Sequence, residues 1–389
     1  MNGNLNKQSL TIGKLFGIKI RFHVSWLVIF TLVAWTVISG YLPTYYSGLS
    51  LQIRIIDGIV ITVLFFASVL AHELAHSLTA RRYGIKIQRI TLFLFGGAAE
   101  LQQEPTNAKA ELMMTIAGPL TSLAAALFFG AIWLIGIRLH VQAIEIIAGI
   151  VAVLNLSVGV FNLIPAYPLD GGRIFRALMW LKTQDIVSAT RAASYLSYAL
   201  SYLLITVGVL EFFSGGFING LWAVLLGFFL HQLTRVGYRQ TVEQKQLAGL
   251  KVADIMEADF LSVPSDTTVE EYLNHYLLIR KQYDCLVMDG DTVVGILSAT
   301  RAMSVSDPQM SIVKIMVRVN SRMLLGLNDS ALRAVQIMER YNVHILPVYR
   351  EHQLAGTVTL GQIGEYLRLR QALSQKTLPK MQKDIKHAT

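Results

Sequence analysis

Long apolar runs fill the first 234 residues of this chain and restrict the folds that it can adopt. Each run contains about 20 predominantly apolar residues, the length that an α-helix needs to cross the hydrocarbon core of a bilayer. We identify six of them: His23–Leu42, Ile55–Ala80, Ala110–Ile137, Ala143–Ile164, Ala192–Phe213 and Phe217–Thr234. The rest of the chain is more polar, so the overall 53% of hydrophobic residues is a mixture of two compositions. We expect a polytopic α-helical membrane protein with about six transmembrane helices, followed by a cytoplasmic α/β region.

The basic residues between these runs predict the topology. Lys and Arg are frequent before the first run, between the second and third, between the fourth and fifth, and after the sixth, and they are sparse in the other loops. The positive-inside rule then places both termini in the cytoplasm. Because the net charge of +9 follows this distribution and forms no basic face with aromatic platforms, we expect no nucleic-acid partner. The single cysteine, Cys285, excludes an intrachain disulfide and a cysteine-based zinc site.

The second apolar run contains a metal-binding pattern, His72-Glu73-Leu74-Ala75-His76. Residues i and i+4 share one face of a helix, so both imidazoles can reach one metal ion, and Glu73 beside them can act as a general base. Ionisable side chains in a membrane helix are costly, which favours a functional role for all three. A catalytic zinc ion normally has three protein ligands, so a third ligand is needed.

Asp170 is our candidate for that third ligand. It lies in the segment Asn162–Arg173, whose two prolines cannot continue a regular helix and whose two glycines allow a close approach of the backbone. The charge-based topology puts Asp170 at the same cytoplasmic end of the membrane as His76. Taken alone, Asp170 is equally consistent with a capping residue at a membrane boundary.

The segment from Ile85 to Leu101 follows the metal-binding pattern directly. It is rich in β-branched and aromatic residues, and Gly96-Gly97 predicts a turn, so we expect a membrane-associated β-hairpin. An exposed edge of this hairpin can bind an extended peptide by strand addition. The alternative is an amphipathic hairpin that only covers the membrane face.

The polar region contains an internal repeat with an offset of about 60 residues. Gly295-Ile296-Leu297-Ser298, for example, corresponds to Gly356-Thr357-Val358-Thr359. Each copy has the pattern helix, strand, strand, helix. We therefore place a membrane domain at 1–238, a linker at 239–250, the two repeats at 251–310 and 311–370, and a polar tail at 371–389.

Taken together, these motifs resemble those of the site-2 protease family of intramembrane zinc metalloproteases. The resemblance rests on His72–His76, on Asn162-Leu163-Ile164-Pro165 with Leu169-Asp170-Gly171-Gly172, on Ala117-Gly118-Pro119 and on the segment from Gly17 to Trp26. It implies that His72, His76 and Asp170 bind one Zn²⁺ per chain and that Glu73 is the general base and then the acid. It also implies that Asn162 helps to hold the substrate or the developing oxyanion, and that the hairpin at Gly96 and Gly97 receives the substrate. The alternative for Asn162 is a hydrogen bond between helices.

The repeated region is similar to a pair of CBS domains. Such pairs often bind adenine nucleotides, so the resemblance makes Ser298 and Thr359 candidate nucleotide-binding residues. The acidic residue that usually holds the ribose is replaced in both repeats, by Arg301 and by Gln362. A pair that only dimerises, or only docks on the membrane domain, is the alternative.

The resemblance implies a transmembrane protein substrate, specifically a membrane-tethered regulatory protein, in the plasma membrane of a prokaryote. The intact His72, Glu73, His76 and Asp170 favour an active enzyme over a catalytically silent sensor or scaffold. A channel or transporter regulated by CBS domains would be expected to carry an internal membrane repeat, and the sequence contains one broken span and no such repeat.

Overall fold

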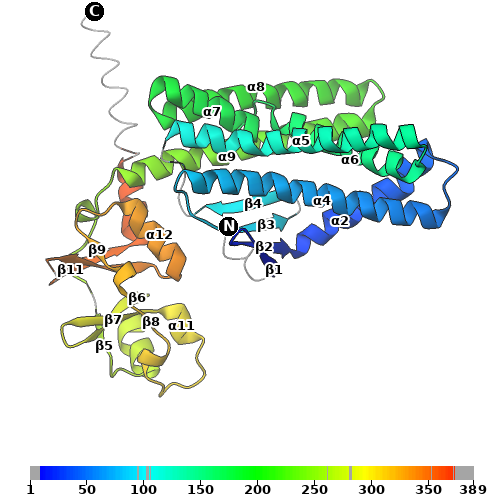
Figure 1. Ribbon diagram of the computed structural model, residues 1–389. Helices are drawn as coiled ribbons and strands as arrows, with labels where there is room; N and C mark the ends of the chain where they lie inside the picture. Colours follow the sequence, from blue (N-terminus) through cyan, green and yellow to red (C-terminus); the bar gives the residue numbers. More distant parts are fainter. Residues whose placement is uncertain are drawn as a thin grey trace, which may run out of the picture. The chain divides into compact units, whose positions relative to one another are not determined.

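The computed structural model describes residues 9–93, 96–101, 105, 107–260, 262–279, 283–351, 353–370 and 372. All of the predicted polar tail except residue 372 lies outside this range. The chain divides into two compact units, Met1–Thr241 and Val242–Thr389, and each is described by itself (Figure 1).

Within the described residues, six helical segments are long and apolar enough to cross a membrane, as predicted, and all lie in the first unit except the end of the sixth. Their outward faces carry large apolar side chains, which is expected of helices that contact lipid. The chain is therefore a multi-pass membrane protein. The six are Val24–Tyr45 (α2 Val24–Trp35, the π-helix η1 Thr36–Tyr41 and α3 Leu42–Tyr45), α4 Leu51–Arg82, α5 Ala108–Leu139, α6 Gln142–Asn162, α8 Ile186–Phe213 and α9 Phe217–Ala248.

The extent of α9 differs from the predicted linker at 239–250. Residues 239–248 continue the sixth membrane helix without a break. The polar composition of residues 239–250 predicts a linker, but Glu, Gln, Lys and Arg are also good helix formers. The helix therefore runs past the apolar run that precedes it.

Helices α4, α5 and α6 lie side by side (Figure 1). A polar bond crosses between α4 and α6, where buried Asn155 donates to the hydroxyl of Ser68 at 3.2 Å. A hydrogen bond between helices was the alternative role predicted for Asn162. The structure shows such a bond at Asn155, two turns earlier on the same helix.

A four-stranded sheet lies against α4, and it is larger than the predicted hairpin. Its strands are in the order β1-β2-β3-β4, with β2 parallel to β3 and both outer pairs antiparallel. Ile18, Ile20 and Ile90 pack against the α4 residues Leu70, Leu74 and Leu78. The strands are β1 Ser9–Leu15, β2 Ile18–His23, β3 Ile87–Phe93 and β4 Gly96–Leu101.

The prediction that Gly96 and Gly97 form the turn was wrong. Both are strand residues of β4, because Gly96 pairs with Phe93 and Gly97 with Leu92. Glycine adopts extended backbone as readily as turn backbone, so its presence alone could not fix the position of the turn.

The break predicted after the fourth apolar run is present. Helix α6 ends at Asn162, and a new helix, α7 Asp170–Thr183, begins after a seven-residue connection. This helix was not predicted. It places Asp170 at its first turn.

The second unit contains two similar halves, each with a short strand, helical turns, an antiparallel strand pair and a further helix. The short strands β5 and β9, each parallel to its neighbour, were not predicted. In the first half the elements are β5 Ser262–Pro264, α10 Val269–Glu271, η3 Tyr272–Ile279, β6 Asp284–Asp289, β7 Thr292–Ser298 and α11 Ala299–Met303. Strand β8 (Val317–Arg318) comes later in the chain but pairs with β7 in the sheet of the first half. The second half has η5 Ser321–Met323, β9 Leu325–Gly326, α12 Ala331–Tyr341, β10 Ile345–Arg350, β11 Gln353–Thr359 and a helix over 360–370.

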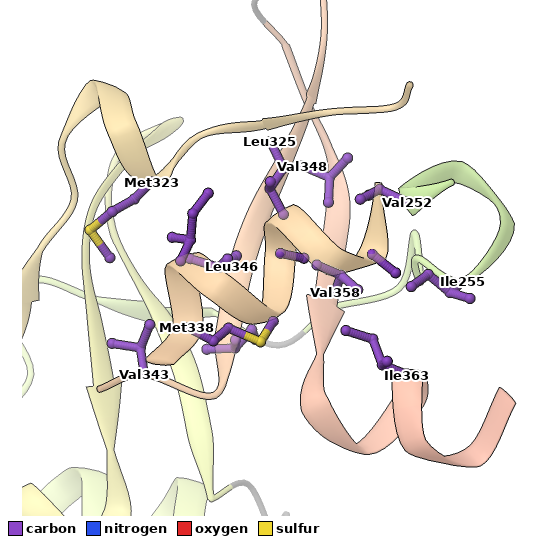
Figure 2. Close-up of a cluster of buried hydrophobic side chains, with 14 of the residues drawn as sticks. Val252, Ile255, Met323, Leu325, Met338, Val343, Leu346, Val348, Val358 and Ile363 are labelled. Atoms are coloured by element: carbon purple, nitrogen blue, oxygen red, sulfur yellow. The ribbon is translucent and has the colours of Figure 1, made fainter. Parts of the chain in front are cut away.

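The short helical turn that precedes each half in the chain packs in the core of the other half. Helix η2 (Val252–Asp254) precedes the first half, yet Val252 and Ile255 pack with Leu346 and Val358 of the second (Figure 2). Likewise η4 (Ile312–Lys314) precedes the second half, and Ile312 packs in the core of the first. Each half needs an element from the other, so the two fold as one unit.

Candidate metal centre

Three side chains converge between α4 and the start of α7. His72 and His76 lie one turn apart on α4, and Asp170 is the first residue of α7. Their Nε2 atoms are 3.1 Å apart, and each lies 3.2 Å from Asp170 Oδ2. The side chain of Asp170 is 13% exposed and that of His72 is 6% exposed. Two imidazoles and one carboxylate thus meet in a nearly equilateral triangle of ligand atoms.

This triangle fits a zinc ion. Bonds of about 2.0–2.1 Å at tetrahedral angles put neighbouring ligand atoms about 3.3–3.4 Å apart. The observed separations of 3.1 Å and 3.2 Å lie within about 0.2 Å of those values. The three residues would occupy three positions and leave the fourth open, as in catalytic zinc sites.

Helix α5 orients both imidazoles. The Nδ1 atom of His76 lies 2.8 Å from the carbonyl oxygen of Met114, and Nδ1 of His72 lies 2.9 Å from the hydroxyl of Ser122. A carbonyl can only accept, so Nδ1 of His76 carries the proton, which leaves a lone pair on Nε2 for the metal. Partners of this kind fix the ring orientation and the tautomer of a metal-binding histidine.

Gly118 lies between these two partners on α5 and faces the ligand atoms. A Cβ atom placed there would lie 2.6 Å from His72 Nε2 and would also collide with His76 Nε2. Met114, Gly118 and Ser122 are spaced by four residues, so they form one face of α5. A side chain at the middle position would occupy space that the imidazoles need.

The backbone around Asp170 is also packed closely. A Cβ at Gly171 would collide with the carbonyl oxygens of Leu163 and Ile164, and one at Gly172 would collide with the backbone at Tyr167. These two glycines therefore allow the first turn of α7 to lie directly on the connection that precedes it. That contact sets where the Asp170 carboxylate is held.

The other predicted residues of this unit lie on three different elements. Glu73 is half-buried and follows His72 on α4, and Asn162 is half-buried at the last position of α6. Gly96 and Gly97 lie in β4, which is an edge strand of the sheet. No hydrogen bond within the described residues fixes the side chain of Asn162.

Comparison with known proteins identifies the family. The model of peptidase family M50 matches residues 60–138 and 130–206, and the CBS domain model matches 252–307 and 319–368. Rip3 of Mycobacterium tuberculosis, named as a zinc metalloprotease, is 34% identical over 308 residues, 78% of each chain. The chain belongs to peptidase family M50.

One further relative agrees with this assignment, and a solved structure is also similar. The protein sll0528 of Synechocystis, also named as a zinc metalloprotease, is 29% identical to this M50 peptidase over 90% of this chain and 92% of its own. A solved structure, the site-2 protease from Methanocaldococcus jannaschii, is 28% identical, with a TM-score of 0.39 over 58% of this chain and 94% of that chain. The enzyme class is therefore zinc metalloprotease, as the resemblance implied.

Sequence reasoning missed the residues of this M50 peptidase that orient the ligands. The sequence gives Gly118 only as part of the motif Ala117-Gly118-Pro119, and it does not single out Met114 or Ser122. The signal in the sequence was the pair Gly118 and Ser122, two small residues four positions apart in an apolar helix. Small residues at that spacing let two helices approach closely.

The two CBS candidates differ in their surroundings. Thr359 Oγ1 accepts from the backbone N–H of Gln362 at 3.2 Å, and the Gln362 side chain accepts from the N–H of Thr359 at 2.7 Å. Ser298 caps α11 without a side-chain hydrogen bond to that helix. Gln362, which stands where an acidic residue is usual, is therefore engaged with Thr359 itself.

Proposed function

We propose that this M50 peptidase hydrolyses a peptide bond within a transmembrane segment of a membrane-tethered regulatory protein, and that its CBS pair regulates the reaction. The observation that carries the proposal is the triangle of His72, His76 and Asp170, whose two histidines lie on α4, a helix apolar enough to span a bilayer. A hydrolytic site at membrane depth has access to bonds that a soluble protease cannot reach.

In this proposal His72, His76 and Asp170 hold the zinc ion. The ion, when bound, activates a water molecule and polarises the carbonyl of the bond to be cut. Glu73 accepts the proton of the attacking water and delivers it to the amine of the leaving peptide. Asn162, at the end of α6, donates its amide to the substrate backbone or to the developing oxyanion.

The substrate must lose helical structure before it can react. A transmembrane helix engages its carbonyls in hydrogen bonds to the fourth residue along the chain, so the target bond is protected until the helix unwinds. We propose that the edge strand β4, with Gly96 and Gly97, pairs with the unwound segment and holds it extended. Glycine or proline in the substrate lowers the cost of unwinding.

The proposed location is the plasma membrane of a prokaryote, with both termini and the CBS pair in the cytoplasm. This orientation is supported by the Lys and Arg residues that cluster in alternate loops. Water and the cleaved cytoplasmic fragment then share the compartment that contains the C-terminal unit.

We propose further that the CBS pair binds an adenine nucleotide through Ser298 and Thr359, and that it forms a homodimer. Arg301 is a cation near Ser298 in the sequence and suits a phosphate. Binding at Thr359 must displace Gln362. Isothermal titration of the full chain with ATP and with AMP tests this proposal, and a Ser298→Ala chain with wild-type affinity would exclude the assigned residue.

The decisive experiment is cleavage of a co-expressed membrane protein by Glu73→Gln beside the wild type. The amide keeps the size of the side chain but cannot accept the proton, so the variant should retain its zinc and lose at least about 100-fold in rate. Glu145→Gln is the matched control, because Glu145 lies in the first turn of α6, at the opposite end of that helix from Asn162.

Cleavage by Glu73→Gln at the wild-type rate would contradict the role of Glu73. A wild-type chain that binds zinc, yet cuts no transmembrane segment in a library of membrane-tethered regulators, would favour a catalytically silent sensor or scaffold.

A further inference from the structure

A buried ion pair joins α7 to α5 beside the ligand triangle. Glu111, in the first turn of α5, is fully buried, and Arg176, on α7, is 3% exposed. Arg176 donates from Nε to Glu111 Oε1 at 2.9 Å and also from Nη2 to the same oxygen. Burying two charges costs free energy that an apolar pair would avoid, so this pair is a poor device for stability alone.

Arg176 also holds Tyr167, which lies three residues before Asp170. Its Nη1 donates to the phenolic oxygen of Tyr167 at 3.0 Å, and its guanidinium carbon lies 4.9 Å from the centre of that ring. Arg176 and Asp170 belong to the same 14-residue helix. The guanidinium therefore connects the helix that bears the ligand to the connection that leads into it.

The backbone of Tyr167 is held by two other helices. Its N–H donates to the hydroxyl of Ser197 on α8 at 2.5 Å, and its carbonyl accepts from the hydroxyl of Thr234 on α9 at 2.7 Å. The carbonyl of Leu230, one turn earlier on α9, shares the same hydroxyl hydrogen at 2.8 Å. Ser197 and Thr234 are both fully buried. Helices α7, α8 and α9 thus form hydrogen bonds with the phenol, the N–H and the carbonyl of Tyr167.

We propose that Glu111, Arg176, Tyr167 and Thr234 form an anchor that positions the ligand Asp170 against His72 and His76. Thr234 and Arg176 are positioning residues that touch neither metal nor substrate. The inference rests on the proposed metal site.

The physical reason lies in the different demands of the two ligand types. His72 and His76 belong to one continuous helix, which fixes their spacing without help. Asp170 arrives from a separate helix after a non-helical connection, so its distance to them depends on tertiary contacts. A metal site tolerates deviations of about 0.2 Å, which an unanchored connection cannot guarantee.

The test compares metal binding by the full-length chain in detergent. Thr234→Val and Tyr167→Phe each remove one bond of the anchor and keep the side-chain shape, and Arg176→Lys keeps the charge but loses the fork of donors. Thr190→Val is the matched control, because Thr190 is equally buried and donates to the carbonyl of Ile186 in its own helix. The readouts are the Zn²⁺ affinity from chelator competition, the visible spectrum of the Co²⁺-loaded chain, which reports ligand geometry, and the melting temperature.

The anchor variants should lose about 10–100-fold in Zn²⁺ affinity and show an altered Co²⁺ spectrum, as expected when outer partners of a metal site are lost. Thr190→Val should match the wild type in both. Wild-type affinity and spectrum in Thr234→Val and Tyr167→Phe would overturn the anchor and leave the proposed function standing, and so would an equal loss in Thr190→Val. A wild-type chain that binds no metal would overturn both. If Arg176→Lys does not fold, the two milder variants decide.

Discussion

Replacing Gly118 with alanine should abolish metal binding while leaving the helix that carries it intact. The new methyl group would lie 2.6 Å from His72 Nε2, whereas ordinary contact begins at 3.4 Å. The His72 ring must therefore move by about 0.8 Å, several times the deviation of about 0.2 Å expected in a metal site. The methyl group also collides with His76, so neither ring can move toward the other.

The expected loss of Zn²⁺ affinity is more than about 100-fold, because a displaced ligand costs more than the 10–100-fold typical of a lost outer partner. Helix stability should change in the opposite direction, since alanine is favoured over glycine in a helix interior by about 0.5–1 kcal/mol. Loss of metal from a chain with unchanged melting temperature would thus separate the site from the fold.

Gly130→Ala supplies the control. It lies on the same helix, and no neighbouring atom is within 4 Å of a Cβ placed there. Chelator competition on the two purified variants measures the difference. Gly118→Ala with wild-type Zn²⁺ affinity would refute the inference that this face of α5 borders the metal.

Three further predictions concern single side chains. Ser122→Ala removes the partner of His72 Nδ1, so Zn²⁺ affinity measured by chelator competition should fall about 10–100-fold; an unchanged value would mean that the ring is held by packing alone. Asp170→Ala should reduce the zinc content of the purified chain below that of the wild type, and full occupancy would show that another residue supplies the third ligand. Burial raises the pKa of the Cys285 thiol to about 12, so the native chain should resist a thiol-specific reagent at pH 8 and react only on unfolding. Rapid labelling of the native chain would contradict the burial of this thiol. The unfolded thiol ionises near pH 8.5, so above that pH the unfolded state binds fewer protons than the native state. The stability of the C-terminal unit should therefore fall as the pH rises from about 8.5 to about 12.

The metal ligands show how far local patterns reach. The spacing of His72 and His76 is a property of any α-helix, so the sequence alone places both on one face. Asp170 could be predicted as a ligand because the prolines before it exclude a regular helix and the glycines after it allow a close approach of the backbone, but those residues say nothing of where the chain goes next. The structure supplies the new helix α7, and with it the 3.2 Å distances to both histidines.

The β-hairpin shows the opposite limit. Composition predicted strands around Ile90, and strands are present, but the turn was placed on glycines that pair within β4. The partner strand β2 lies about 70 residues earlier in the chain, and no local pattern specifies a pairing of that range.

The sequence by itself determined the six membrane helices, the repeat in the C-terminal unit and the chemical type of the metal site. Each of these can be read along the chain, from the length of an apolar run, from the offset of a repeat or from the spacing of two histidines. Tertiary structure alone decided that Met114, Gly118 and Ser122 shape the site, that Arg176 and Thr234 hold the connection before Asp170, and that the two CBS halves exchange their leading turns. These depend on contacts between distant segments, whose free energies come from packing and buried hydrogen bonds that form only when the helices are assembled.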